Sequence, residues 1–452
     1  MSIPITSENH YKTEERILKP WAQKSRLAGK TRLHGKIPGE NYRTPFQRDR
    51  DRILHSKAFR RLMHKTQVFY SQSGEHIRNR LTHTLEVMQI STSLSKSLGL
   101  NEDLTEAIAL GHDLGHTPFG HTVEAFLEKV LGGEDKYDEK ITKKLFGQDY
   151  KLGPLGGFKH NWQSLKVIDL IEDPYEHLNP GIDLTLAVRE GILKHTKFLG
   201  NYEHYLGILN TKNLFLDIPH SISLEGQIVA LSDEIAQRTH DFEDGLRSDV
   251  INIRDVYDEI KRDKLTLISK ALANFKHDPD IILEGNDSIR RTVTSSLINL
   301  YIKDVTKTSS ENILHKNRKG FNWNEGLDIK LINFSKDIEE HDNEFETFLY
   351  KEVYNNQLTN RMDSKAQHVI SNILKAYYND PRRLPSKLLK YYSRQTGRTY
   401  LREMYKSEVK EEIARMQECP IYIRTICDHI AGMTDKYAFD EYQKLFQPFE
   451  FV

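Results

Sequence analysis

Residues 111–124 read Gly111-His112-Asp113-Leu114-Gly115-His116-Thr117-Pro118-Phe119-Gly120-His121-Thr122-Val123-Glu124. This run brings three histidines, one aspartate and one glutamate within thirteen residues. Adjacent His112 and Asp113 lie about 100° apart on a helix, so both side chains can turn toward one point. An imidazole beside a carboxylate suits a divalent ion that also holds water. The run therefore predicts a site with mixed nitrogen and oxygen ligands.

Ligands of the same two kinds recur upstream at His83 and downstream at Asp233. Asp233 is flanked by apolar residues, so it borders a buried helix face and needs a partner there. Four such ligands leave an octahedral ion two open positions, enough for a water and a phosphate oxygen. By itself, Asp233 is explained equally well as a surface or capping residue. That simpler explanation fits His112-Asp113 poorly, because two further histidines follow closely.

Three more side chains are candidates for proton transfer. His116 and His121 lie one turn and just over two turns past His112, and Glu124 follows His121 by three residues. A His and a Glu at that spacing face each other on a helix, as an acid–base pair must. His160 follows a glycine turn and is a further imidazole. A histidine in such a place more often simply starts a helix.

Arg80 precedes His83 by three residues on the same predicted helix. Its guanidinium can therefore point at whatever the metal site binds, and a phosphate is the natural guest. A nearby basic group is explained more simply as a solvated face than as a substrate contact. That group comprises Lys57, Arg60, Arg61 and Lys65.

Composition excludes several classes of protein. The 452 residues contain 65 Lys and Arg against 65 Asp and Glu, so neither a global basic field nor an acidic disordered chain is expected. Two cysteines, Cys419 and Cys427, rule out a disulfide framework and a thiolate zinc cage. The first 25 residues lack an apolar signal core, and no apolar stretch approaches membrane-spanning length. A cytoplasmic protein without a membrane partner is expected.

Helical periodicity runs from residue 80 to the end of the chain. Gly99 is placed to close the first of these helices, and Asn101 to cap the next. Residues 66–79 are the best candidate for a small β-hairpin. The sequence therefore predicts an all-α fold with at most that hairpin.

Three regions are predicted along the chain. Residues 1–50 form an extended basic arm, residues 51–250 the metal-dependent core, and residues 251–452 a C-terminal helical region. That last region is expected to pack on the core and at oligomer interfaces. The basic character is strongest at the start, where residues 1–65 hold 16 Lys and Arg against 6 Asp and Glu.

These residues resemble the HD-domain superfamily, whose pattern is His, then His-Asp, then Asp around a metal. Within it, the chain is similar to the bacterial deoxyguanosinetriphosphate triphosphohydrolase-like proteins. The similarity extends over nearly the whole chain. It covers residues 56–62, 65–69, 80–87, 111–124, 157–161, 190–195, 233–241 and 430–438.

The resemblance implies an HD-domain helical fold and hydrolysis of a deoxynucleoside triphosphate (dNTP), either dGTP or several dNTPs. Water attacks the α-phosphorus, and the products are the deoxynucleoside and inorganic triphosphate. A divalent metal ion (Mg, Mn or another transition metal) is implied. Its ligands are His83, His112, Asp113 and Asp233. The implied catalytic residues are the proton-transfer pair His121 and Glu124, with His116 and His160 beside the α-phosphate.

The resemblance also implies substrate contacts and partners. Gln67 matches a residue that contacts the sugar 3′-hydroxyl, Arg80 one near the phosphate, and Asn161 and Gln237 are further candidates. Many relatives have Tyr where this chain has Gln237, which leaves sugar and base preference open. Expected partners are a dNTP substrate, a dNTP effector, identical subunits in a tetramer or hexamer, and single-stranded DNA.

Two alternatives stay open at this point. Another HD-type phosphohydrolase, either a 5′-nucleotidase or a cyclic-nucleotide phosphodiesterase, would release orthophosphate or a linear nucleotide instead of triphosphate. A regulator that binds single-stranded nucleic acid through the basic arm would have a vestigial metal site. The intact set of four ligands argues against that second alternative.

Overall fold

The computed structural model is all-helical over the residues that it describes, as the sequence predicts. Within them it holds twenty α-helices and a single isolated antiparallel bridge, between Thr66 and Asn79. This bridge lies at the base of the predicted hairpin. Residues 70–76, which lie between Thr66 and Asn79 in the sequence, are outside the described part of the chain. The described residues are 6–35, 42–69, 77–132, 137–172, 181–196, 209–274, 279–284, 287–323 and 325–447.

The helices differ widely in length. Those of the first half are α1 (Ser7–Ile17), α2 (Ser25–Ala28), α3 (Pro45–Leu54), α4 (Lys57–Arg61), α5 (Arg80–Leu98), α6 (Glu102–Gly111), α7 (His121–Leu131), α8 (Glu139–Phe146), α9 (His160–Lys166), α10 (Leu186–Leu193) and α12 (Leu224–Arg247). Those of the second half are α13 (Ile253–Lys261), α14 (Thr266–Asn274), α15 (Asp287–Arg318), α16 (Lys336–Leu349), α17 (Gln357–Asn379), α18 (Ser386–Thr396), α19 (Lys406–Gln417), α20 (Pro420–Ala431) and α21 (Asp435–Phe446). Among the described helices, none combines the length and apolar character that crossing a bilayer requires.

The sequence predicts two helix boundaries near the site, at Gly99 and Asn101, and both are confirmed. Gly99 ends α5 with a left-handed φ of 70°, a conformation that glycine adopts at little cost. Asn101 caps α6 by accepting a hydrogen bond from the Leu104 amide. α7 begins at His121, after the glycine-containing turn. These three boundaries determine where the His112-Asp113 pair lies relative to α5, α6 and α7.

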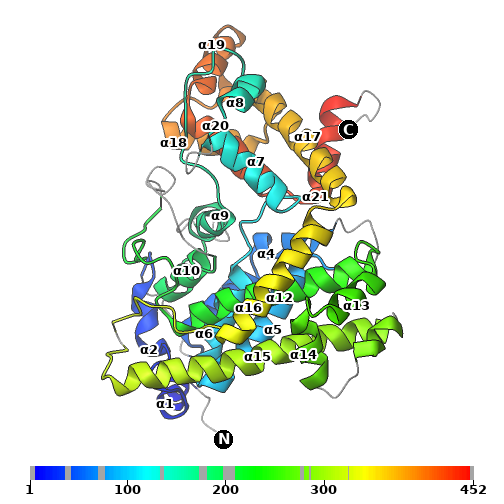
Figure 1. Cartoon of the computed structure of the whole chain (residues 1–452). Helices are drawn as coiled ribbons and strands as arrows, with labels where there is room; N and C mark the ends of the chain where they lie inside the picture. The colour runs from blue at the N-terminus through cyan, green and yellow to red at the C-terminus, as the bar shows by residue number, and fades with distance from the viewer. Residues whose placement is uncertain are drawn as a thin grey trace, which may run out of the picture.

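Buried apolar side chains form two separate clusters. The first core joins α3, α5, α6, α10, α12, α14, α15 and α16. The second core joins α7, α8, α17, α18, α20 and α21. Figure 1 shows the helices of the second core gathered at the top of the view and those of the first core below them. The division of the chain into three regions stays a prediction, because these clusters describe packing only.

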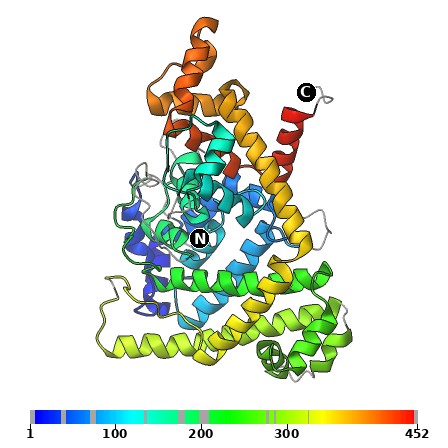
Figure 2. The ribbon, with the colours of Figure 1, turned by 45° about the horizontal axis from the view of Figure 1, so that its top comes forward.

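α16 and α17 connect the two cores. Val353, in the π-helical segment Tyr350–Tyr354 between them, belongs to the first core, whereas Ala366 in α17 belongs to the second. Figure 2 shows the two helices following one another from the lower group toward the upper one. The C-terminal helices of the second core therefore follow directly in sequence after a helix of the first core.

The N-terminal arm is not extended over residues 7–17, contrary to the sequence prediction. Thr6 and Asn9 form a capping box that starts α1. Arg26 then pairs with Glu8 and Glu15 of that helix, each at 3.0 Å. Part of the basic excess of this region is thus neutralised within the chain itself.

Candidate active site

The four predicted metal ligands meet at one point in the first core. His83 comes from α5, His112 and Asp113 follow the last turn of α6, and Asp233 lies within α12. α5, α6 and α12 pack against one another. The ligand atoms of His83, His112 and Asp113 lie within 4.8 Å of each other. The structure therefore brings together residues that are up to 150 positions apart.

Close packing of α6 against α10 holds the end of α6 in place. A Cβ on Gly111 would lie 2.4 Å from the Ile192 side chain, and a Cβ on Gly191 would lie 2.4 Å from Ile108. Only glycine permits this approach at both positions. The His112-Asp113 pair is consequently presented from a fixed helix end.

The distances between ligand atoms suit one shared cation. Asp233 Oδ1 lies 2.9 Å from His83 Nε2 and 3.6 Å from His112 Nε2. His112 Nε2 lies 3.4 Å from Asp113 Oδ1. Ligands bound about 2.1 Å from one ion are separated from each other by roughly 3 to 4 Å. The observed spacing falls in that range.

The charges of the cluster also fit a divalent cation. Burial alone would raise the pKa values of Asp113 and Asp233, but interactions with neighbouring histidines, His112 first among them, and for Asp113 also with Arg80, hold both pKa values well below the usual range. His112 Nε2 is buried and has no hydrogen-bond partner among the described residues. Two carboxylates beside an imidazole nitrogen that makes no hydrogen bond form a donor set for a hard or borderline metal ion.

A contact at the Nδ1 atom orients the imidazole ring of each of the two metal-ligand candidates His112 and His83. His112 Nδ1 lies 2.6 Å from the Ala109 carbonyl oxygen. A proton on this nitrogen leaves Nε2 free to act as a ligand. Behind His83, Nδ1 lies 3.3 Å from His240 Nδ1, and His240 Nε2 lies 3.0 Å from Glu86 Oε2. Such outer contacts fix the ring orientation of metal-binding histidines.

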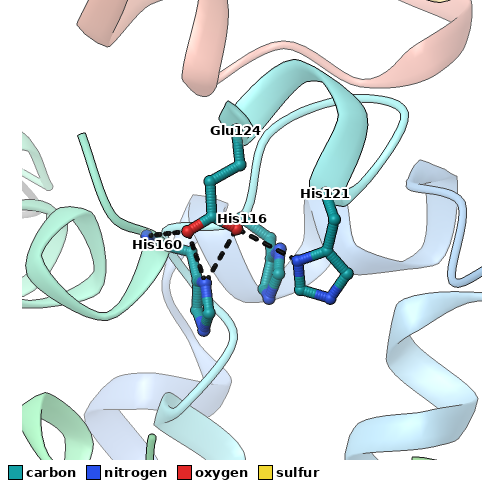
Figure 3. Close-up of side chains that lie close together, drawn as sticks. All are labelled: His116, His121, Glu124 and His160. Carbon is teal, nitrogen blue, oxygen red and sulfur yellow. Dashed lines mark hydrogen bonds and ion pairs between the residues drawn. The ribbon is translucent and has the colours of Figure 1, made fainter. Parts of the chain in front are cut away.

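The predicted catalytic residues form a second cluster beside the first. Glu124 Oε2 lies 3.1 Å from His121 Nδ1 and 3.0 Å from His160 Nδ1. Figure 3 shows His121 and His160 on either side of Glu124, with the His116 ring between their rings. The rings of His116 and His160 stack with centroids 3.9 Å apart. The expected facing of His121 and Glu124 is therefore observed.

Burial and charge differ within this second cluster. Burial would raise the pKa of Glu124, but His160 and His121 hold that pKa well below its usual range. Burial and Arg80 together hold the pKa of His116 well below its usual range. The His121 side chain is 61% exposed. The cluster thus combines an ionised carboxylate, a neutral buried imidazole and a solvent-accessible one.

Asp113 connects the two clusters. Its Oδ1 lies 3.1 Å from His116 Nε2, and its Oδ2 accepts a hydrogen bond from Arg80 Nη1 at 2.8 Å. Arg80 is 1% exposed, and its Nε and Nη2 have no hydrogen-bond partner within the described ranges. Buried guanidinium nitrogens without partners fit a phosphate guest.

The remaining predicted substrate residues differ in their surroundings. Gln67 is buried, and its Oε1 has no partner in the described part of the chain. The Asn161 amide is occupied by packing contacts, because it donates to the Leu193 carbonyl at 2.8 Å and accepts from the Trp162 amide at 3.0 Å. The first of these bonds joins α9 to α10 and the second lies within α9, and a substrate contact by Asn161 stays a prediction.

Gln237 stands one helical turn after Asp233 and lies next to a tyrosine from another element. The hydroxyl of Tyr354 donates to Asp241 Oδ2 and also contacts the Gln237 side chain. Tyr354 belongs to the π-helical segment after α16. A tyrosine hydroxyl is thus present near this position, although neither Tyr354 nor Asp241 was predicted as a site residue.

Two further histidines were also missed. His195 is 3% exposed, and its Nε2 lies 3.2 Å from His160 Nε2. No spacing along the chain indicated His195. His240 lies seven residues after Asp233, on the same face of α12, and that spacing was a usable signal.

Comparison with known proteins agrees with this geometry. The HD domain matches residues 80–237, which span all four predicted metal ligands, and the phosphohydrolase-associated domain matches residues 332–405 and 400–444. Proteins named deoxyguanosinetriphosphate triphosphohydrolase-like protein are similar over nearly their whole length. The one from Geobacter metallireducens is 36% identical over 443 residues, which cover 95% of this chain and 97% of the relative.

Two other relatives with the same name give the same result. The protein from Bordetella pertussis is 37% identical over 92% of this chain and 93% of its own length. The protein from Nitrosomonas europaea is 36% identical over 95% of this chain and 98% of its own length. With HD-type metal-ligand candidates brought together, the chain is a metal-dependent phosphohydrolase of the HD type, and it belongs to the family of deoxyguanosinetriphosphate triphosphohydrolase-like proteins.

Proposed function

We propose that this chain hydrolyses one or several dNTPs, dGTP among them, to the deoxynucleoside and inorganic triphosphate. Water attacks the α-phosphorus, and the bond between that phosphorus and the 5′-oxygen breaks. The substrate class comes from the names of relatives that cover almost the whole chain. The residues of the site support the class of reaction, which is metal-dependent phosphate hydrolysis.

One observation carries the proposal, namely the position of Asp113 between the two clusters. Its Oδ1 lies 3.4 Å from His112 Nε2 and 3.1 Å from His116 Nε2. A phosphate bound beside it would meet the metal ligands, a guanidinium and a neutral imidazole together. Phosphoryl transfer depends mainly on such positioning and on stabilisation of the developing charge.

The metal ligands proposed are His83, His112, Asp113 and Asp233. When bound, a divalent cation would polarise the phosphoryl oxygens and make a nearby water more acidic. Arg80 Nε and Nη2 hold a phosphate oxygen, since these nitrogens have no other partner among the described residues. His116 Nδ1, which is equally without a partner there, faces the same phosphate.

His121 and Glu124 are assigned the proton transfer. Because Glu124 accepts the Nδ1 proton of His121, the Nε2 atom of His121 is left to donate a proton to the departing 5′-oxygen. Glu124 stabilises the protonated ring, and His160 holds Glu124 from the other side. The exposed His121 ring can then recover its proton from solvent.

Several expected partners stay predictions of the sequence. They are a tetramer or hexamer, an activating dNTP and single-stranded DNA. The basic arm is a weaker reason to expect DNA binding than its composition indicated, because Arg26 and Arg43 pair with acidic residues of the same chain.

Product analysis tests the proposed reaction directly. Each dNTP is incubated with the protein and Mn²⁺ or Mg²⁺, singly and in mixtures, and the products are separated by ion-pair chromatography. The deoxynucleoside and triphosphate are expected in equal amounts. Cleavage in mixtures alone would add an activating nucleotide.

Other products would identify the alternatives. Release of orthophosphate or of a linear nucleotide would place the activity among 5′-nucleotidases or cyclic-nucleotide phosphodiesterases. If no triphosphate appeared with any metal or mixture, the proposed function would be wrong.

A further inference from the structure

The two halves of the proposed site rest on different cores. The four predicted metal ligands lie on or directly after helices of the first core. His121 and Glu124 lie on α7, whose apolar side chains belong to the second core. Residues 112–120 connect the halves and carry His116. Any shift of one core against the other would therefore change the distance between the metal ligands and the proton-transfer pair.

Asp435 holds this connection from the C-terminal helices. It is the first residue of α21, is 4% exposed, and accepts three hydrogen bonds. Its Oδ1 accepts from the Phe119 amide at 2.9 Å, and its Oδ2 accepts from the Thr66 amide at 2.7 Å and from the Thr66 hydroxyl. One carboxylate therefore ties α21 to the turn before His121 and to the segment that leads to Gln67.

The turn needs such a restraint. Phe119 has a φ of +57°, which is unfavourable for a residue with a side chain, and Gly120 follows with a φ of +62°. Strained backbone of this kind persists only where surrounding contacts impose it. The Phe119 ring also packs edge-on against Phe439 of α21, with ring centroids 5.0 Å apart. α21 thus supports the strained residue through both its amide and its ring.

Lys65 forms a second link between residues 112–120 and the C-terminal helices, here through α20. It is 3% exposed, not part of the solvated face that the sequence indicated. Its ammonium donates to the carbonyl of His116 and, at 3.0 Å, to the carbonyl of Ala431 at the end of α20. The backbone of the residue that contacts Asp113 is therefore held by a lysine that also holds the C-terminal helices.

We propose that Asp435 is a positioning residue that aligns the proton-transfer half of the site with the metal half. It acts through Phe119 and Thr66 and touches neither the metal ligands nor the proposed substrate. Its effect on turnover rests on the proposed function, whereas its effect on the turn does not. A carboxylate is required because three donors converge on it, and an amide in its place would turn an NH2 group toward a donor.

Asp435→Asn tests this role in the full-length protein. The kcat should fall on the order of 10²-fold, as expected when a catalytic group is misplaced by about 1 Å. The KM and the affinity for Mn²⁺, titrated alone, should stay within about twofold of the wild-type values. Hydrogen–deuterium exchange should accelerate in a peptide covering residues 114–124 and stay unchanged in α5 and α12.

Glu412→Gln is the matched control. Glu412 is a buried carboxylate of the same C-terminal helices, is 5% exposed, and pairs with Arg398 and Arg415. This variant should leave both turnover and the exchange of residues 114–124 unchanged. If Asp435→Asn fails to fold, Thr66→Val removes one of the three donors and should accelerate exchange in the turn, while Thr66→Ser should restore wild-type exchange.

Two results would overturn the proposal. One is unchanged exchange in residues 114–124 in Asp435→Asn and in Thr66→Val. The other is a loss of Mn²⁺ affinity equal to the loss of turnover, which would show that Asp435 supports the whole site. Exchange and metal binding are measured without substrate, so they decide the matter even if the wild-type protein releases no triphosphate.

Discussion

The metal half of the site and the proton-transfer half differ in what holds them. Three helices that pack directly on one another supply the metal ligands, so their geometry depends on the first core alone. The His121–Glu124 pair lies on a helix whose packing partners are mainly residues 366–438. Metal binding should therefore depend on the first core, whereas turnover should depend on both cores. Variants that change turnover without changing metal binding, or the reverse, test this difference between the two halves.

Loss of a metal ligand should have the largest effect. His112→Ala and Asp233→Ala each remove a donor from a four-ligand set, so both bound metal and turnover should fall to background. Metal content by mass spectrometry and triphosphate release are measured on the same samples. His368→Ala, at an exposed histidine that contacts Tyr442, is the control. Full activity in His112→Ala would contradict the assignment of the ligands.

Loss of the proton-transfer ring should have the next largest effect, and it should separate the two halves. His121→Ala removes the proposed acid, so kcat should fall about 10²–10⁴-fold. Bound Mn²⁺ should be unchanged, because the ring lies outside the ligand set. A substrate with a more acidic leaving group should recover part of the rate, since it needs less protonation. Equal loss of rate for both substrates would argue against a role as general acid.

A smaller effect is expected from the contact behind His83. His240→Ala removes the imidazole 3.3 Å from His83 Nδ1, so Mn²⁺ affinity should fall about 10–100-fold. Turnover at saturating Mn²⁺ should change much less, because the proton-transfer half is untouched. Isothermal titration with Mn²⁺ provides the measurement. A fall in kcat at saturating metal without any change in affinity would reverse the expected pattern.

The smallest effect should be on dynamics. Because a ligand stabilises the states that bind it, Mn²⁺ should slow hydrogen exchange in α5, α6 and α12. Exchange in α17, α18 and α20 should change less, since these helices belong to the second core. Uniform slowing across all helices would show that the two cores open as one unit.

Local signals in the sequence were sufficient for much of this structure. Gly99 and Asn101 were predicted as helix boundaries because each residue has a strong preference for that position. The His112-Asp113 pair and the His121–Glu124 pair were predicted because their spacing on a helix fixes their relative direction. His83 and Asp233 were candidates from their residue types, and the resemblance added the family and joined all four residues into one ligand set.

Features that depend on distant contacts were not predictable in this way. α1 was missed because it buries no residue and so leaves no apolar periodicity to detect. Asp435 contacts residues 369 and 316 positions away, and no local pattern encodes such a pairing. Lys65 was read as solvated because a lysine is usually exposed, and its two buried carbonyl partners come from separate elements.

The most direct test of the account is to measure bound Mn²⁺ and triphosphate release on one preparation of Glu124→Gln. We expect full metal occupancy with turnover reduced about 10²-fold or more, because Glu124 orients His121 and holds none of the metal ligands. Loss of the metal together with turnover would contradict it, as would wild-type turnover. Either result would show that metal binding and proton transfer are not assigned to separate halves of the site as proposed.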